Sequence, residues 1–426
     1  ISMLIDGWMY QVFSGRWEGL SDRGMFLNDI ADLNWKRMND LGCSAVYLLG
    51  LWDSRGVITV EEEEGVDLIK MKDRIPSMMA LRDHTMVHPN LGNENDLKKF
   101  VNKLHDLKVK VIVDFVPNHT STEHPWITQH PEYYYWQDGR LIKEFSGDVA
   151  KLNYGNNELR KEMQNVLVKM VEMGIDAVRC DMAHLIPVDF WQETIELVKR
   201  ENENFIFMAE AYPKSPFDME AIMLLDQAGF EGIYDSILFN NLENVIVHQQ
   251  PASYISAHLS EWKKWGKSLP IRYAGNHDDP PLNNRNVNSN RDEMVDKYFE
   301  CLVALVLFGG GMPLIFNGFF MGFNKRIAHH WREMLDNKYI ELENSLPEIV
   351  NIMLESYVEC KNGEWEWEAR EQLIIGRFNR NDKQMTLVLN FGNVDIQISD
   401  LEGKGIWHGL TNESLIPSGK AEMLVS

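Results

Sequence analysis

Four short apolar runs of the sequence end in side chains that could take part in catalysis. These side chains are Asp114 and His119, Arg179 and Asp181, Glu210, and His277 and Asp278. Several carboxyl groups together can supply a nucleophile or base and a proton donor, the two roles that acid–base and nucleophilic catalysis require. A single carboxylate after a strand is often only a helix cap or a solvated turn. The prediction of a catalytic site therefore depends on the joint occurrence and the order of the four segments.

Strand geometry predicts which of these side chains face the same way. Side chains two positions apart share a face, so Arg179 and Asp181 point together while Cys180 points to the opposite side. The guanidinium favours an ionised Asp181, which suits a nucleophile, although the alternative is a structural ion pair. Glu210 follows the apolar run 205–209, so we expect a raised pKa and a protonated carboxyl, which suits a general acid. Cys180 is expected to be a small buried hydrophobe and not a reactive thiol.

The elements that carry these residues alternate along the chain. Apolar or β-branched runs and amphipathic stretches follow one another, which is typical of parallel strands linked by helices. The expected strands are 7–13, 44–51, 109–116, 177–183, 205–211, 232–238, 270–277 and 312–318. The expected helices are 28–41, 95–107, 157–173, 189–200, 292–308 and 346–359. Eight strands predict a (β/α)8 TIM barrel, whose strand ends converge on one mouth, with an open doubly wound sheet as the competing topology.

Two segments interrupt this alternation. Residues 120–153 are rich in His, Pro, Tyr and Trp and form a long connection after the third expected strand. From residue 363 onward, alternating runs separated by turn signals predict a small antiparallel β domain. We therefore expect a barrel domain over 1–362, with an inserted loop region at about 120–153, and a C-terminal β domain over 363–426.

Composition and charge exclude several classes of protein. The chain has 426 residues, of which 44% are hydrophobic, and a formal net charge of −22, which disfavours nucleic acid as a partner. The apolar stretch 301–316 is short for a membrane span and contains three consecutive glycines, so no membrane partner is expected. The four cysteines lack the paired spacing of metal or redox motifs. Together with the absence of a recognisable leader, they favour the cytoplasm. The oligomeric state is left open.

The four strand ends also resemble, in the same order, the four sequence regions of the α-amylase family of glycoside hydrolases, family thirteen. Region one is similar to Asp114-Phe115-Val116-Pro117-Asn118-His119, region two to residues 174–181, region three to Glu210, and region four to Asn276-His277-Asp278. Residues 82–92 and 313–318 resemble connecting segments of the family, so the likeness covers most of 7–360. The resemblance implies a (β/α)8 barrel followed by a C-terminal β domain.

The resemblance also implies a function and roles for individual residues. It implies a retaining glycoside hydrolase that cleaves α-glucosidic, in particular α-1,4, bonds of malto-oligosaccharides or starch-like glucans through a covalent glycosyl-aspartate intermediate. It makes Asp181 the nucleophile, Glu210 the general acid and Asp278 the carboxylate that grips the sugar. It assigns substrate binding to Arg179, His119, His277, Asp114 and His184, the last at a position where many relatives carry Lys. The implied partner is an oligosaccharide or polysaccharide, and no cofactor is implied. Two alternatives stay open, an α-glucan glycosyltransferase using the same intermediate and a catalytically weak carbohydrate-binding protein.

Besides His184, four residues depart from the family pattern. Met79 stands where a Tyr commonly stacks on the sugar, which predicts weaker positioning of the substrate. Lys151 stands where an Asp helps the residue matching Asn118 to hold a calcium ion, and an ammonium group would repel that ion, so we expect no metal. Phe319 and Phe320 follow the eighth expected strand, where the family often has Gln-Glu. This pair predicts a more apolar wall and is a hint toward transfer.

Overall fold

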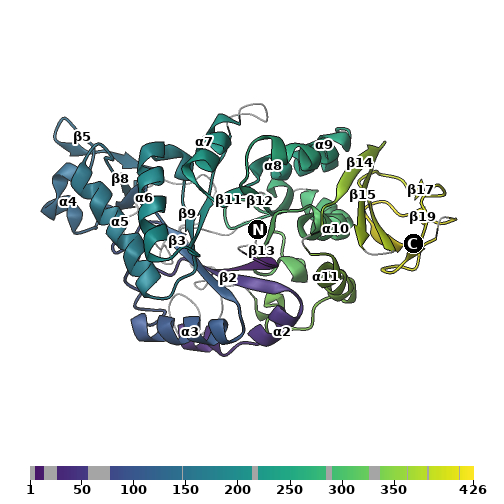
Figure 1. Cartoon of the computed structure of the whole chain (residues 1–426), viewed down its shortest axis with the longest axis horizontal. Helices are drawn as coiled ribbons and strands as arrows, with labels where there is room; N and C mark the ends of the chain where they lie inside the picture. Colours follow the sequence, from purple (N-terminus) through teal and green to yellow (C-terminus); the bar gives the residue numbers. More distant parts are fainter. Residues whose placement is uncertain are drawn as a thin grey trace.

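Eight parallel strands close into a barrel at the centre of the molecule (Figure 1). The computed structural model of the chain describes residues 5–13, 26–55, 77–145, 147–213, 219–284, 290–325, 336–361, 363–380, 383–411 and 413–426. The barrel strands are β1 (Trp8–Phe13), β2 (Cys43–Leu49), β3 (Lys110–Phe115), β9 (Ala177–Cys180), β10 (Ile206–Ala209), β11 (Gly232–Tyr234), β12 (Leu269–Arg272) and β13 (Met312–Phe316). Each strand pairs with the barrel strands before and after it in the chain, and β13 pairs with β1. The predicted barrel is confirmed, and the open sheet is excluded.

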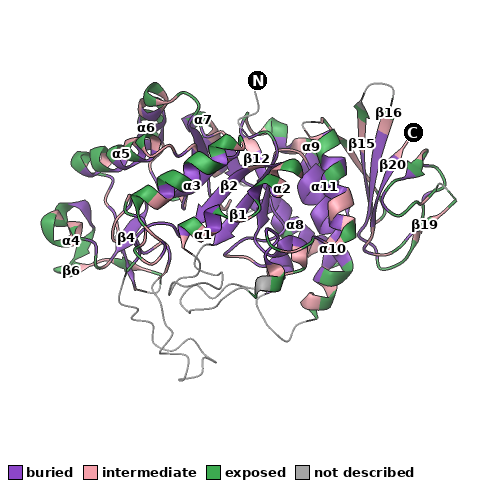
Figure 2. Ribbon diagram, turned by 90° about the horizontal axis from the view of Figure 1, so that it is seen from below, coloured by how far each residue is buried: buried purple, intermediate pink, exposed green. Residues whose placement is uncertain are grey.

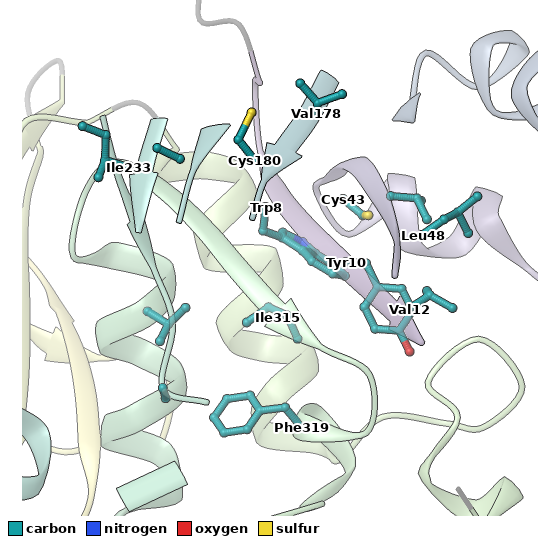
Figure 3. Packing of buried hydrophobic residues seen from close by; sticks show 14 of the residues in the cluster. Trp8, Tyr10, Val12, Cys43, Leu48, Val178, Cys180, Ile233, Ile315 and Phe319 are labelled. Carbon is teal, nitrogen blue, oxygen red and sulfur yellow. The ribbon is translucent and has the colours of Figure 1, made fainter. Parts of the chain in front are cut away.

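Alternate residues of the barrel strands enter two separate hydrophobic clusters, as the two-residue period of a strand requires. Met9 and Ile112 pack inside the barrel. Trp8 and Tyr10 face the surrounding helices in an outer layer, which Figure 3 shows together with Cys180. Cys180 is fully buried in this outer layer, and burial raises the pKa of its thiol well above the usual value. The prediction that Cys180 is a buried hydrophobe facing away from the barrel interior is confirmed.

Helices surround the barrel with their buried faces toward the strands and their exposed faces outward (Figure 2). They are α1 (Leu27–Ala31), α2 (Trp35–Asp40), α3 (Glu94–Asp106), α5 (Asn157–Glu172), α6 (Val188–Glu201), α7 (Glu220–Ala228), α8 (Ser236–Ile246), α9 (Ser253–Glu261), α10 (Arg291–Phe308) and α11 (Glu348–Cys360). The single helix expected over 28–41 is two helices, because the Asn34 side chain accepts from the backbone N–H of Arg37 and begins a new helix there. Helices α7, α8 and α9 were not predicted. Among the helices in the described ranges, none has the length and apolar character needed to cross a bilayer.

The connection after β3 folds into small pieces of sheet and helix. These are β4 (His119–Ser121), α4 (Trp126–Gln129), η3 (Pro131–Tyr133), β5 (Trp136–Gln137), β6 (Arg140–Leu141), β7 (Lys143–Glu144) and β8 (Val149–Lys151). Strand β8 pairs with β4 on one side and β7 on the other, while β5 and β6 form a separate pair. The pairing of β4 with β8 places Lys151 opposite His119, next to the end of β3. The inserted segment thereby reaches the mouth of the barrel.

The C-terminal part of the chain forms antiparallel sheets on the opposite side of the molecule from α4 and β5 (Figure 1). Its strands are β14 (Glu366–Arg370), β15 (Leu373–Arg380), β16 (Lys383–Asn390), β17 (Ile396–Gln397), β18 (Lys404–Gly405), β19 (Leu415–Ile416) and β20 (Ala421–Val425). Five of them form one sheet in the order β14, β15, β16, β20, β18, and β17 pairs with β19. The predicted antiparallel sheet is confirmed. The domain boundary at residue 363 stays a prediction.

Candidate active site

The carboxyl ends of the barrel strands bring the four predicted segments to one mouth. Asp114 lies near the end of β3, Asp181 directly follows β9, and Glu210 directly follows β10. Asp278 lies in the connection after β12, close enough to Glu210 for their charges to interact. His119, at the start of β4, faces the charge of Asp181. The side chains predicted from four separate segments therefore share one site.

Arg179 is the centre of this site. Its side chain is only 1% exposed, and its Nη1 atom donates to Oδ1 of Asp181 at 2.6 Å. Its Nη2 atom donates to Oε1 of Glu210. The same Nη1 lies 3.6 Å from Oδ1 of Asp114, so three carboxyl groups surround one guanidinium. A buried guanidinium needs such partners, and its planar fork fixes the positions of Asp181 and Glu210 relative to each other.

Glu210 receives hydrogen bonds at both carboxyl oxygens. The backbone N–H of Met182 donates to Oε2 at 2.8 Å, and the Tyr212 hydroxyl donates to Oε1 at 3.0 Å. Met182 adopts a left-handed backbone conformation with φ of 46°, which non-glycine residues rarely do. Such conformations are found at functional sites, where the surrounding structure offsets their cost. Met182 directly follows Asp181, and in this conformation its own backbone N–H donates to the carboxyl of Glu210.

The environment of Glu210 favours its protonated form. Burial is the largest cause, and the negative charges of Asp181 and Asp278 act in the same direction, against the opposing charge of Arg179. Together they raise the pKa of Glu210 to about 8. This confirms the raised pKa predicted from the apolar strand that precedes Glu210. The carboxyl group therefore holds a proton at neutral pH, as a general acid must.

Asp114 is held by donors from the neighbouring strand β2 and its connection. The Tyr47 hydroxyl donates to Oδ1 at 2.5 Å, and the backbone N–H of Gly50 donates to Oδ2 at 3.2 Å. Burial raises the pKa of Asp114 to about 6, although the charge of Arg179 and the hydrogen bond from Tyr47 lower it. These protein contacts occupy both oxygens of Asp114. Its substrate-binding role stays a prediction.

His277 links the barrel interior to Asp278. Nε2 of Gln11, on β1, lies 3.0 Å from Nδ1 of His277, and Nε2 of His277 lies 3.1 Å from Oδ2 of Asp278. When Gln11 donates to Nδ1, a neutral ring carries its proton on Nε2 and donates it to Asp278. The backbone N–H groups of Asp278 and Asp279 both donate to Oδ1 of Asn276, which closes a tight turn. The Asp278 side chain is 35% exposed, so it is accessible to a ligand from the mouth.

The remaining predicted residues lie around the same mouth. His119 is buried, and burial lowers the pKa of its ring, which also hydrogen-bonds the backbone of Met79. Met79 is partly buried against the cluster inside the barrel, and its backbone contact with His119 places it beside the site, while its role toward a sugar stays a prediction. His184 is half-buried, and its Nδ1 lies 3.5 Å from the backbone oxygen of Glu210. The His184 ring packs edge-on against Tyr212 at 6.3 Å between centroids.

Sequence reasoning missed Gln11, Tyr47 and Tyr212, which contact the predicted residues directly. The strand period contains a signal for the first two, because each polar side chain lies on the face that points into the barrel. Gln11 lies two positions after Met9 on β1 and shares its inward face, and it is fully buried although its side chain is an amide. Tyr212 lies after β10, where no regular period predicts its direction.

The residues at the family's calcium position do not fit a calcium ion. The Lys151 ammonium lies 3.0 Å from Oε1 of Glu144, and Nδ2 of Asn118 donates to Oε2 of the same carboxylate at 2.9 Å. Calcium requires several oxygen ligands, whereas here an ammonium group and an amide N–H surround the one carboxylate. Within the described ranges, no three or more His, Cys, Asp or Glu side chains group in a way that could hold a metal. The expected absence of a metal stays a prediction.

The expectation that Phe319 and Phe320 form an apolar wall of the site is wrong. Both belong to the outer hydrophobic layer, where Figure 3 shows Phe319. The Phe320 ring lies 5.4 Å from the ring of Trp8, and the Phe319 ring lies 5.8 Å from that of Phe299. The chain turns after β13 through Gly318, which has a φ of 94°. The two rings therefore do not support glycosyl transfer.

Comparison with known proteins gives a family match over most of the chain. The sequence model described as alpha amylase, catalytic domain, matches residues 35–351. A protein named alpha-1,4-glucan:maltose-1-phosphate maltosyltransferase from Arcanobacterium haemolyticum is 29% identical over 196 residues, which are 44% of this chain and 28% of that protein. The protein of the same name from Picrophilus torridus is 21% identical over 416 residues, which are 92% of this chain and 61% of that protein. The chain thus matches less than two thirds of the length of either relative.

Solved structures agree with the fold. The crystal structure of a maltogenic alpha-amylase, AmyB, from Thermotoga neapolitana superposes with a TM-score of 0.77. The superposition covers 100% of this chain and 97% of that one at 18% sequence identity. At this identity the likeness establishes the arrangement of barrel and C-terminal sheet, and the chemistry must be argued from the side chains themselves.

Proposed function

Because the chain belongs to the α-amylase family, we propose that it is a retaining glycoside hydrolase that cleaves α-1,4-glucosidic bonds of malto-oligosaccharides or starch-like glucans. The observation that carries the mechanism is the Arg179 guanidinium that binds Asp181 and Glu210 through neighbouring nitrogens. Retaining glycosidases hold their two carboxyl groups about 5 Å apart, whereas inverting ones leave a wider gap for water. Two carboxyl groups on one guanidinium suit the closer spacing.

In the first step Asp181 attacks the anomeric carbon of the bound sugar. The bond from that carbon to the glycosidic oxygen breaks while Glu210 gives its proton to the departing oxygen, which leaves as a sugar hydroxyl. The product of this step is a glycosyl ester on Asp181, with Glu210 ionised. In the second step Glu210 removes a proton from water, whose oxygen attacks the same carbon and releases the carboxylate of Asp181. Two displacements at one carbon retain the α configuration.

The other residues around the mouth are assigned to binding and positioning. Asp278, the most exposed carboxylate of the three, accepts hydrogen bonds from sugar hydroxyls, while His277 is held behind it by Gln11. Burial lowers the pKa of His119 and favours a neutral ring, which suits a hydrogen bond to the same sugar. His184, beside Glu210, is assigned to the next sugar along the chain. The sulfur of Met79 gives weaker stacking than an aromatic ring would.

A second candidate function is transfer of the glycosyl group to another sugar. The names of the two curated relatives, both maltosyltransferases, favour it, whereas the name of the Thermotoga protein favours hydrolysis. Both reactions share the ester on Asp181, and they differ in whether water or a sugar hydroxyl attacks it. A catalytically weak carbohydrate-binding protein is the third candidate.

The test is a time course with maltoheptaose in which all products are resolved by chromatography. We expect shorter sugars alone, and none from the Asp181→Asn protein. The control Asp106→Asn replaces an exposed carboxylate at the end of α3 and should keep full turnover. Products longer than the starting sugar would establish transfer. Unaltered maltoheptaose would contradict both activities on α-1,4 bonds, and full turnover by Asp181→Asn would refute the assignment of the nucleophile.

A further inference from the structure

A cavity lies at the opposite end of the barrel from the candidate active site. Its volume is about 500 Å³. Its wall includes Gly7, directly before β1, Leu269, the first residue of β12, and Gly311, directly before β13. The candidate catalytic residues follow the other ends of the parallel strands, and the cavity shares no lining residue with them. A ligand bound there would not compete directly with substrate.

Aromatic rings form much of the wall of this cavity. Trp262 lies in η5 (Trp262–Lys264), Trp365 lies just before β14, and Trp367 lies in β14, which packs against α9 (Figure 1). The rings of Trp365 and Trp367 are stacked, with centroids 5.9 Å apart, and both are only half-buried. The Phe308 ring meets Trp365 edge-on at 5.8 Å. The cavity therefore presents flat apolar surfaces that remain accessible to a ligand.

Cationic side chains predominate among the charged groups of the lining, although the whole chain carries a formal charge of −22. Four are cationic and one is acidic: Lys263, Lys267, Arg272, Lys361 and Glu364. Arg272 is 1% exposed, and its guanidinium lies 5.6 Å from the Trp262 ring centroid. It pairs with the buried Asp235, which fixes it in the wall.

Two of the three lysines around the cavity form ion pairs with carboxylates near its rim. Lys263 pairs with Glu364 at 2.9 Å, and Lys361 pairs with Asp6 at 3.0 Å. Exposed pairs of this kind contribute little to stability and re-form easily. The ammonium group of Lys267 has no ion-pair partner in the part of the chain that the structure describes. Lys267 therefore offers a positive charge to an incoming ligand, and the other two lysines can do so when their exposed ion pairs open.

The same lining is poorly suited to a neutral sugar. Sugar hydroxyls require several polar side chains with unused hydrogen-bonding capacity. The single hydrogen of the Ser268 hydroxyl is already shared between two acceptors, Oδ1 of Asp226 and the backbone oxygen of Phe230. Most other lining side chains are apolar, and Leu307 and Cys360 are examples. A ligand with an apolar ring system and a negatively charged group could contact the aromatic rings with the first and the cationic side chains with the second.

We propose that this cavity is a binding site for a small organic anion with a flat, apolar body. The tryptophan rings would stack on the body, and Lys267 together with the neighbouring cations would attract the anionic group. The proposal is independent of the reaction at the barrel mouth.

Two probes with nearly the same ring system separate the roles of rings and charge. One is the anion 1-anilinonaphthalene-8-sulfonate, and the other is its uncharged counterpart N-phenyl-1-naphthylamine. We expect the native protein to bind one molecule of the anion saturably, and Lys267→Glu to weaken this binding about tenfold, since it replaces an attraction by a repulsion. Binding of the uncharged probe should not change. The matched control Lys98→Glu, on the exposed face of α3, should affect neither probe.

Trp365→Ala should weaken binding of both probes, because it removes a stacking surface. Turnover of maltoheptaose and the far-ultraviolet circular dichroism spectrum should match the unaltered protein, which shows that each variant is folded. The proposal is overturned if the native protein shows no saturable binding of the anion, or if Lys267→Glu and Lys98→Glu have equal effects. Displacement of the anion by maltoheptaose would overturn it as well, in favour of a sugar site.

Discussion

The hydrogen bond from Tyr212 to Glu210 gives a prediction with a definite sign. Turnover requires a protonated Glu210, so kcat/KM should fall as pH rises through its pKa of about 8. The Tyr212 hydroxyl donates to Oε1 at 3.0 Å and therefore stabilises the ionised carboxylate. Tyr212→Phe removes this donor and keeps the ring. The pKa of Glu210 should rise, and the alkaline limb of the profile should move to higher pH.

The magnitude follows from the strength of a hydrogen bond to a charged group. Such bonds contribute about 1.5–3 kcal/mol, and about 1.4 kcal/mol corresponds to one pKa unit. Tyr212 is only half-buried, so water replaces part of the lost bond and the lower end of the range applies. The alkaline limb of the pH profile of kcat/KM should therefore move to higher pH by about one unit.

The assay is the pH dependence of kcat/KM with maltoheptaose, which reports the groups of the free enzyme. Tyr254→Phe serves as the control, because Tyr254 lies exposed on α9 and outside the four segments that form the site, and its profile should not move. An alkaline limb that stays in place in Tyr212→Phe, or that moves to lower pH, would refute either the role of Glu210 as general acid or the direction of this hydrogen bond.

Three further predictions test other parts of the account. Gln11→Ala removes the partner that holds the His277 ring, so kcat/KM for maltoheptaose should fall about tenfold in initial-rate measurements, and unchanged kinetics would contradict a positioning role. Lys151 pairs with Glu144 at the place where the family resemblance implies a calcium ion, so chelation with EDTA should leave Tm unchanged in a thermal scan, and a lower Tm after chelation would contradict this. Cys180 is buried outside the barrel, so the native protein should not react there with a thiol reagent, and Cys180→Ser should lower the free energy of unfolding in urea by about 1–3 kcal/mol. Its kcat/KM should remain that of the unaltered protein, and a loss of turnover in a folded variant would contradict the outward direction of this side chain.

The barrel could be predicted because its strands are apolar on both faces and are separated by amphipathic helices. That signal weakens where a helix has no polar face. Helix α8 buries most of its residues, including Asn241, so its sequence lacks the contrast that marks α3 or α6. The helix expected over 28–41 was divided by the single capping residue Asn34. Local chemistry of this kind changes element bounds without changing the fold.

The site could be predicted for side chains within strands, because the two-residue period of a strand determines the face on which each side chain lies. Arg179, Cys180 and Asp181 face the way a two-residue period requires, because they belong to β9 or directly follow it. The period no longer predicts where a side chain points once the strand has ended. Phe319 turns outward after Gly318, and Tyr212 turns back toward Glu210, and neither direction follows from the local sequence. The contacts of Gln11 with His277 and of Tyr47 with Asp114 join segments that are far apart in the chain, so the local sequence does not predict them.

The most direct test of the central claim is to trap the glycosyl ester on Asp181. The Glu210→Gln protein, which cannot activate water, is mixed with α-maltosyl fluoride, whose fluoride leaves without the help of a general acid. Peptides are then sequenced by tandem mass spectrometry. The account predicts one maltosyl group on the carboxylate of Asp181. A maltosyl group on Asp278 or on any other residue would contradict it, as would release of β-maltose, the inverted product, without any labelled peptide.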